Sequence, residues 1–372
     1  MKILVDASIV SKGGGVQVAL AFLENISKNK TFEVICIVNE VIDEQLDISV
    51  KSKFYFYCVE KIVPMYKKFE QGKRISAIED QLKPDFVFIV FGAAYWKPKA
   101  TSLQGFALGK MLYAKELEIG LSEKIVNIIK KILFKFSGSY LLAETELIKR
   151  KLAKHLNYSE DRIFSIGNSY SPAFQSCIEI NKHTMVPNQD YFQILVPGSY
   201  YPHKNLERVL QAIEKIKKKI LNIRFLFTIP ENSEEWKRFY EYAQKIGVAE
   251  LIETTGFIPN SRFGELYLKS DAVLCASLVE SSTAVFPEAL IAERPLLVSN
   301  RPYATELCEN AALYFDPLDY ISIADAVLKI HSDINLRKEL VENGKIVLKK
   351  NYPSANEKWI QQRDLILKLA DR

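Results

Sequence analysis

The sequence predicts an α/β protein built from two doubly wound parallel sheets in tandem. Short runs rich in Val, Ile, Leu and Phe alternate along the chain with stretches of helical periodicity, an order typical of parallel sheets with helices on both faces. Many of these runs are continuously apolar, as strands buried on both faces should be. The length of 372 residues exceeds what one ordinary core needs and suits two domains.

Six candidate strands precede residue 170 and six follow residue 190. They are KILVDA, FEVICIVN, KFYFYCV, DFVFIVF, YLLAE and RIFSIG, then FQILVPG, IRFLFTI, LIETTG, DAVLCAS, PLLVSN and ALYFD. The stretch between the two sets is polar, contains two prolines and has no clear period, which is typical of a linker. We therefore predict a first Rossmann-like domain at 1–172, a linker at 173–190, a second Rossmann-like domain at 191–350, and a final helix at 351–372 that crosses back to the first domain.

The composition indicates a soluble, folded protein. Hydrophobic residues make up 48% and charged residues 26%, and the net charge of +5 is too mild to argue for a nucleic-acid partner. The five cysteines are scattered and form no C-x-x-C pair, so we expect free thiols in a reducing cytoplasm. The N-terminus reads as a first strand without a signal peptide, and apolar runs such as Phe86–Trp96 are too short to span a membrane.

A glycine-rich loop, SKGGGVQVAL, follows the first predicted strand and opens a helix. Glycines let backbone N–H groups approach a ligand, and a helix N-terminus favours an anion. The spacing is not G-x-G-x-x-G, because Val18 stands at the last position, and this disfavours a dinucleotide enzyme. Contact with a phosphate or acceptor and a loop without a ligand both remain open.

Two loops of the second domain carry candidate ligand contacts. In VPGSYYPHKNLERVL, Lys204 would lie at a helix start, where a cation can neutralise a diphosphate. A solvated lysine on a turn is the alternative, but the surrounding Gly, Pro and Asn favour a binding loop. In TTGFIPNSRFGELYLKSDAVLCAS, backbone groups of Phe257 and Ile258 could meet a nucleobase, although any loop after a parallel strand can look similar.

The segment ESSTAVFPEAL places two carboxylates beside one strand–helix junction. Pro287 suits a first helical turn and Glu288 suits the helix dipole, so Glu288 has a simple structural explanation. Glu280 has none: it follows a buried strand, at the edge where parallel sheets bind ligands. Two carboxylates here can accept hydroxyls of a sugar and of a ribose.

Taken in order, these motifs resemble the retaining glycosyltransferases of family 4, which have the GT-B fold. The resemblance covers about residues 192–350, and the first domain matches more loosely through its glycine loop and AETELIKRKLAKHLNYSEDRIFSIGNS. It implies two Rossmann-like domains facing a central cleft, with a nucleoside-diphosphate sugar held mainly by the second. The matching segments are GSYYPHKN, GFIPNSRFGELYLKSDAVLCAS, the two acids, ALIAERPLLVSNRPYATEL, ALYFDPLDYISIADAV and DINLRKELVENG.

The resemblance also implies roles for individual residues. Glu288 would bind the ribose hydroxyls, Glu280 the donor sugar and Lys204 the diphosphate, which makes Glu280 and Lys204 the expected catalytic residues. Residues 283–285 would offer backbone groups to the phosphates, and residue 258 would lie near the base. The other expected contacts are the donor-binding residues Gly198, His203, Ile258, Ser281, Thr283, Ala284 and Val285, and the first-domain cleft residues Gly14 and Gly15.

The implied activity is hexosyl transfer to a glycan or lipid-linked glycan in bacterial surface polysaccharide assembly, such as O-antigen, capsule or lipopolysaccharide. Family members of this type need no metal or other cofactor, and no D-x-D pair stands out here. Three departures leave alternatives open: ESST replaces a common E-G-F-G, Ser199 replaces a common arginine, and the middle of the first domain lacks a histidine. A GT-B protein of other chemistry, such as an epimerase, and a non-catalytic member remain the alternatives.

A basic amphipathic segment lies at 122–136. Its apolar residues, Ile125, Ile128, Ile129, Ile132, Leu133 and Phe136, recur at helical spacing, and Lys124, Lys130, Lys131 and Lys135 flank them. Such a helix could lie on an anionic membrane, which would make the protein peripheral on the inner face of the cell membrane. The alternative is an ordinary helix packed on the sheet with solvated lysines.

Overall fold

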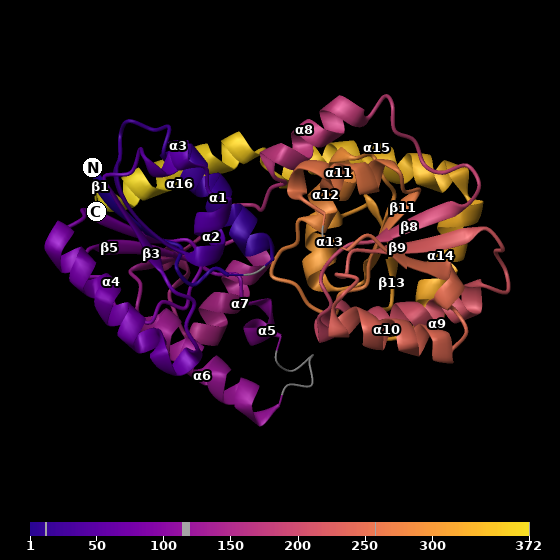
Figure 1. Cartoon of the computed structure of the whole chain (residues 1–372), viewed down its shortest axis with the longest axis horizontal. Helices are drawn as coiled ribbons and strands as arrows, with labels where there is room; N and C mark the ends of the chain where they lie inside the picture. The colour runs from indigo at the N-terminus through magenta and orange to yellow at the C-terminus, as the bar shows by residue number, and fades with distance from the viewer. Residues whose placement is uncertain (12, 114–119, 257, 372) are drawn as a thin grey trace. The chain divides into compact units, whose positions relative to one another are not determined.

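The computed structural model describes residues 1–11, 13–113, 120–256 and 258–371, and it forms two compact α/β units (Figure 1). The first unit comprises Met1–Asn168 and Ser354–Arg372, and the second comprises Ser169–Pro353. Each unit has one sheet in which all the strand pairs are parallel. The predicted α/β class with two parallel sheets is confirmed.

The first unit has a seven-stranded sheet in the order β3-β2-β1-β4-β5-β6-β7. The strands are β1 (Lys2–Asp6), β2 (Glu33–Asn39), β3 (Phe56–Glu60), β4 (Phe86–Ile89), β5 (Thr101–Gly105), β6 (Tyr140–Ala143) and β7 (Ile163–Ser165). The helices are α1 (Gly14–Ile26), α2 (Glu40–Gln45), α3 (Ile48–Lys51), η1 (Met65–Lys67), α4 (Lys68–Leu82), α5 (Gly109–Leu112), α6 (Leu121–Phe136), α7 (Glu146–Leu156), η2 (Glu160–Arg162) and α16 (Ala355–Ala370).

Strand β5 is the one strand of this sheet that the hydrophobic pattern did not predict. Leu103 is its only large apolar residue, and the buried positions on either side are Ser102 and Gln104. Gly105 is the last residue of the strand, and a Cβ added there would clash with the carbonyl oxygen of Val90. The strand therefore depends on its neighbours β4 and β6 rather than on its own apolar content.

The second unit has a six-stranded sheet in the order β10-β9-β8-β11-β12-β13, with each strand at a predicted run. The strands are β8 (Phe192–Val196), β9 (Ile223–Phe227), β10 (Ile252–Thr254), β11 (Ala272–Cys275), β12 (Leu296–Ser299) and β13 (Ala312–Phe315). The helices are α8 (Pro172–Asn181), η3 (Pro202–Lys204), α9 (Leu206–Ile216), α10 (Glu234–Lys245), η4 (Ala249–Leu251), α11 (Asn260–Leu268), α12 (Val285–Ile291), α13 (Pro302–Cys308), α14 (Tyr320–Ser332) and α15 (Ile334–Asn351).

Helix α8 occupies part of the stretch predicted as a linker. Its N-cap Ser171 accepts from the Phe174 backbone, and Pro172 fits the first turn. The helix packs closely on α11: a Cβ added at Gly264 of α11 would lie only 3.1 Å from Cys177 Sγ of α8. This helix belongs to the second unit.

The last helix, α16, returns to the first unit, as predicted. A capping box between Ser354 and Glu357 starts it. Trp359 packs edge-on against Phe22 of α1, with ring centroids 5.4 Å apart, and Ile366 is fully buried in the same core. Figure 1 shows α16 in yellow beside the indigo α1. Among the described helices, none is both long and apolar enough to cross a membrane.

Candidate active site

Two neighbouring strands of the second unit, β8 and β11, bring the main predicted residues together. The loop after β8 carries Lys204 at the end of η3, and the loop after β11 carries Glu280. Since β8 and β11 are paired and parallel, their carboxyl ends meet at one edge of the sheet. This topology explains how residues 76 positions apart in the sequence form one site.

Lys204 and Glu280 form a partly buried ion pair. Lys204 Nζ lies 2.6 Å from Glu280 Oε1, with side chains 15% and 12% exposed. The same oxygen accepts a hydrogen bond of 2.8 Å from Ser277 Oγ. Burial lowers the pKa of Lys204, but the adjacent carboxylate outweighs burial, so this pKa lies above its ordinary value. Lys204 is therefore a stable cation at neutral pH.

The turn that carries Lys204 is held in place by its neighbours. Gly198 has a φ of 131°, and a Cβ there would lie 3.5 Å from Lys204 Cε. Asn205 has a left-handed backbone, and its side-chain amide donates to the carbonyl oxygens of Pro317 at 2.8 Å and Ala276 at 3.3 Å. Gly198 thus suits the positive φ of this turn, and Asn205 fixes the turn against the loop after β11.

His203, also predicted as a donor contact, lies in the same turn. Its imidazole stacks on the Tyr201 ring, with centroids 5.5 Å apart and an interplanar angle of 18°. Its backbone oxygen accepts from Leu278 N–H at 2.7 Å. This bond ties the Lys204 turn directly to the loop that carries Glu280.

Glu288 lies in the first turn of α12 and is buried, with 7% of its surface exposed. The Tyr267 hydroxyl donates to its Oε2 at 2.7 Å. Burial raises the pKa of Glu288 to about 7, and the tyrosine hydrogen bond offsets only part of that rise. The two acids of ESSTAVFPEAL therefore differ: Glu280 has a lysine partner and Glu288 has a phenol.

The loop between the two acids is compact. Ser281 and Thr283 are buried, whereas Ala284 is half-buried. The Val285 N–H, one of the backbone groups expected to face phosphate, donates to Thr283 Oγ1 at 3.3 Å. Ser282, which the sequence analysis did not select, has a buried hydroxyl without a hydrogen-bond partner in the described structure.

The other predicted contacts lie on other elements of the fold. Ile258 is half-buried between β10 and α11, and Phe257 lies outside the described residues. In the first unit, α1 starts at Gly14, where a Cβ would meet open space. A Cβ at Gly15 would lie 3.0 Å from Val10 Cγ1, so Gly15 serves close packing.

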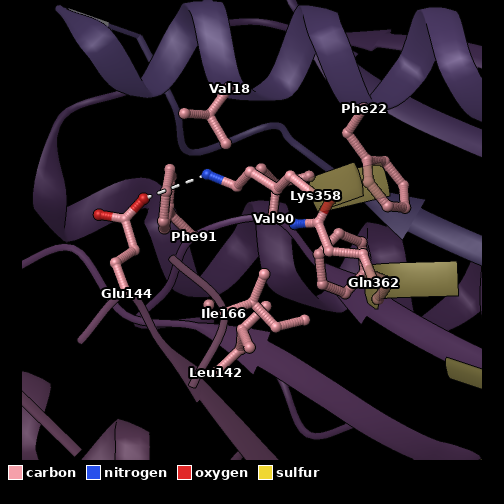
Figure 2. A pocket seen from close by; sticks show the side chains of 11 residues that line it. Val18, Phe22, Val90, Phe91, Leu142, Glu144, Ile166, Lys358 and Gln362 are labelled. Atoms are coloured by element: carbon pink, nitrogen blue, oxygen red, sulfur yellow. Dashed lines mark ion pairs between the residues drawn. The ribbon is translucent and has the colours of Figure 1, made fainter. Parts of the chain in front are cut away.

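A pocket in the first unit holds a second Lys–Glu pair that the sequence analysis missed (Figure 2). Lys358 Nζ lies 3.5 Å from Glu144 Oε1 and donates to Asn168 Oδ1 at 3.0 Å. Apolar side chains, among them Val18 and Phe91, line the pocket around them. Burial lowers the pKa of Lys358 and raises that of Glu144. In the sequence, the one signal for this pair is that Lys358 directly precedes Trp359, a large apolar residue of the amphipathic C-terminal segment.

The described residues include no group of three or more His, Cys, Asp or Glu side chains placed to hold a metal ion. The chemistry of the second unit is instead that of a cation and two carboxylates at the carboxyl edge of a parallel sheet. Such a set can neutralise phosphate and accept hydroxyl groups.

Residues 178–347 match the family model of glycosyl transferases group 1. The matched group 1 region contains Lys204, Glu280 and Glu288. The O-antigen chain mannosyltransferase RfbU of Salmonella typhimurium (strain LT2) is 25% identical over 217 residues, 55% of this chain and 56% of that protein. The uncharacterized glycosyltransferase MJ1607 of Methanocaldococcus jannaschii is 23% identical over 220 residues, 56% of this chain and 55% of that protein. The chain thus spans about half the length of the curated relatives it matches.

Solved structures match nearly the whole chain. A glycosyltransferase from Rickettsia africae ESF-5 has a TM-score of 0.71 at 16% identity, covering 99% of this chain and 98% of its own. WaaG, a glycosyltransferase involved in lipopolysaccharide biosynthesis, has a TM-score of 0.74 at 14% identity. The match covers 98% of this chain and 99% of WaaG. Anabaena Alr3699/HepE in complex with UDP-glucose has a TM-score of 0.73 at 13% identity. The match covers 99% of this chain and 100% of that chain. At these identities the likeness establishes the fold, which is GT-B as predicted.

Proposed function

We propose that the protein is a retaining family 4 glycosyltransferase that moves a hexose from a nucleoside-diphosphate sugar to a glycan or lipid-linked glycan. The observation that carries this proposal is the Lys204–Glu280 ion pair, which lies with Glu288 inside the group 1 region. The relative RfbU is named an O-antigen chain mannosyltransferase, and HepE was solved with UDP-glucose. These names support a nucleotide-sugar donor and a role in surface polysaccharide assembly.

The proposed chemistry follows from the charges of the site. Glycosyl transfer builds positive charge on the sugar and negative charge on the leaving diphosphate. Lys204 leaves Glu280 to pair with the diphosphate, and Glu280 accepts hydroxyls of the donor sugar. The bond from the anomeric carbon to phosphate breaks, a bond to the acceptor oxygen forms on the same face, and the leaving phosphate takes the acceptor proton. The protein supplies neutralisation and alignment, without a metal or another cofactor.

A panel of nucleoside-diphosphate sugars tests this function by thermal shift and calorimetry. One donor should bind the wild type, and Glu288→Ala should lose that binding because the ribose contact is removed. Glu265→Ala is the matched control, since it removes a carboxylate of neighbouring α11 that pairs with Arg262. Failure of the wild type to bind any donor would contradict the proposal and favour a non-catalytic role.

Helix α6 supports a peripheral position on an anionic membrane. Its side chains Leu121, Ile125, Ile128, Ile132 and Phe136 are each more than half exposed, and Phe134 is its one buried residue. This exposed apolar face, flanked by lysines, supports membrane contact over the alternative of a helix packed on the sheet. We propose that it contacts anionic lipid at the inner face of the cell membrane, near a lipid-linked acceptor.

Vesicle binding tests this membrane contact. The protein should bind phosphatidylglycerol-containing vesicles in a salt-sensitive way. Glutamine substitution of Lys124, Lys130, Lys131 and Lys135 should abolish binding. The same substitution of Lys215, Lys217, Lys218 and Lys219, around the end of α9, should not. Equal binding by the α6 variant and the wild type would contradict the proposal.

A further inference from the structure

Tyr267 is a fully buried tyrosine whose hydroxyl reaches the candidate ribose-binding acid. It lies near the end of α11, with 0% of its surface exposed, and its hydroxyl donates to Glu288 Oε2 at 2.7 Å. A buried phenol needs a hydrogen-bond partner, and a carboxylate is a strong acceptor. The bond therefore fixes the direction of one Glu288 oxygen.

The surroundings of Tyr267 hold its hydroxyl in this position. The ring packs edge-on against Phe174 of α8, with centroids 5.2 Å apart at 89°, and against Phe263 at 5.8 Å. The backbone oxygen of Tyr267 accepts from Arg294 Nε at 2.9 Å, which ties the end of α11 to the turn after α12. Ring and backbone are both immobilised, so the phenol is pre-organised toward Glu288.

Several charged groups on the elements around Glu288 have other partners. Arg294 bonds to backbone carbonyls, and strand β12 carries no titratable side chain. On the neighbouring helices, Arg262 pairs with Glu265 on α11, and Gln175 donates to Glu179 on α8. On α15, Lys345 pairs with Glu293 and Glu342, and Lys350 pairs with Glu309. Burial and Tyr267 are accordingly the two influences on the Glu288 carboxyl.

We propose that Tyr267 is a positioning residue of the donor site, which orients Glu288 through Oε2 and leaves Oε1 to accept a ribose hydroxyl of the nucleotide. This inference rests on the proposed function and adds a residue to it. Tyr267 itself touches no substrate. Its effect passes through the orientation and protonation of Glu288.

The arrangement predicts a pH dependence for donor binding. The ionised carboxylate is the better acceptor, and burial raises the pKa of Glu288 to about 7, so affinity should rise as pH passes through that value. The Tyr267 bond favours the ionised form and lowers this pKa. Tyr267→Phe should therefore move the midpoint upward by about one pH unit.

Calorimetry with the tightest donor of the panel, from pH 5.5 to 9, measures this shift. Tyr267→Phe should bind about 5- to 10-fold more weakly than the wild type at pH 6.5 and nearly as well at pH 9. Tyr314→Phe is the matched control, because it removes a tyrosine bond to a backbone oxygen, that of Glu309. An unchanged midpoint in Tyr267→Phe, or a loss of equal size at every pH, would overturn the inference.

A ligand-free measurement separates this inference from the proposed function. The carboxyl ¹³C resonance of Glu288, followed by NMR, should titrate near pH 7 in the wild type and about one unit higher in Tyr267→Phe. Donor binding with an unshifted titration would overturn the positioning role alone. If the wild type binds no donor, the proposed function and the positioning role both fail.

Discussion

Within the residues that the structure describes, each unit buries one Lys–Glu pair, and the pKa values of the two lysines are shifted in opposite directions. Lys204 and Glu280 of the second unit are 2.6 Å apart, and Ser277 adds a hydrogen bond to the shared oxygen. Lys358 and Glu144 of the first unit are 3.5 Å apart in an apolar pocket. The side chains of both pairs are similarly exposed. The pKa of Lys204 is nevertheless raised, whereas the pKa of Lys358 is lowered.

The difference shows that proximity and hydrogen bonding, rather than residue type, decide in which direction the pKa of a buried lysine moves. A close, well-bonded pair offsets more of the desolvation of its ions than a longer pair does. Glu288 is the limiting case, since it has no cation and its pKa rises to about 7. The second unit therefore keeps Lys204 charged beside Glu280, whereas in the first unit the pair joins the returning helix to the residue that follows β6.

The largest effect should come from Lys204→Ala. Loss of this cation removes stabilisation of the charge that develops on the leaving diphosphate, so kcat/KM should fall about 100- to 1,000-fold. Lys215→Ala, on the surface of α9, should leave kcat/KM unchanged. A Lys204→Ala enzyme within a few-fold of the wild type would show that the pair in the second unit is structural.

Lys358→Met should act on stability instead. It leaves Glu144 buried without a partner, so the free energy of unfolding, measured with denaturant, should fall by about 3–5 kcal/mol. Adding Glu144→Leu should restore most of the loss, and donor affinity should change in neither variant. A double variant as unstable as the single one would rule out the uncompensated charge as the cause.

Glu288→Gln should change how stability depends on pH. The native protein holds a proton on Glu288 up to about pH 7, whereas the unfolded chain releases it near 4.5. The wild type therefore loses stability relative to Glu288→Gln as pH rises through this window, by roughly 3 kcal/mol. Paired denaturant melts from pH 4 to 8 measure the difference, and parallel curves would contradict the raised pKa.

The smallest expected change is a gain of affinity. Glu280→Gln releases Lys204 from its charged partner, so a nucleoside diphosphate without a sugar should bind about 2- to 5-fold more tightly. Sugar transfer should fall, because Glu280 no longer offers a charged acceptor to the sugar. Weaker binding of the plain diphosphate would show that Glu280 supports Lys204 rather than competing for it.

The sequence was sufficient for the sheets because most strands are continuously apolar. It failed at β5, where Ser102 and Gln104 are buried by neighbouring strands rather than by their own hydrophobicity. It also missed helix α8 inside the polar stretch before the second sheet. That helix is held by close packing on Gly264, which appears only once α11 has formed.

The candidate site was partly predictable for the same reason. Lys204 and Glu280 lie in loops after strands, and Glu288 lies in the first turn of α12. The topology brings Lys204 and Glu280 together as a pair. The Tyr267–Glu288 bond and the Glu144–Lys358 pair could not be predicted, because no spacing pattern marks contacts between distant buried side chains.

A crystal structure of the protein with the tightest nucleoside diphosphate bound tests the account most directly. We predict the diphosphate within hydrogen-bond distance of Lys204 Nζ, the ribose on Glu288 Oε1, and a Lys204–Glu280 distance longer than the present 2.6 Å. A nucleotide bound away from Lys204, with that ion pair intact, would contradict the assignment of the donor site.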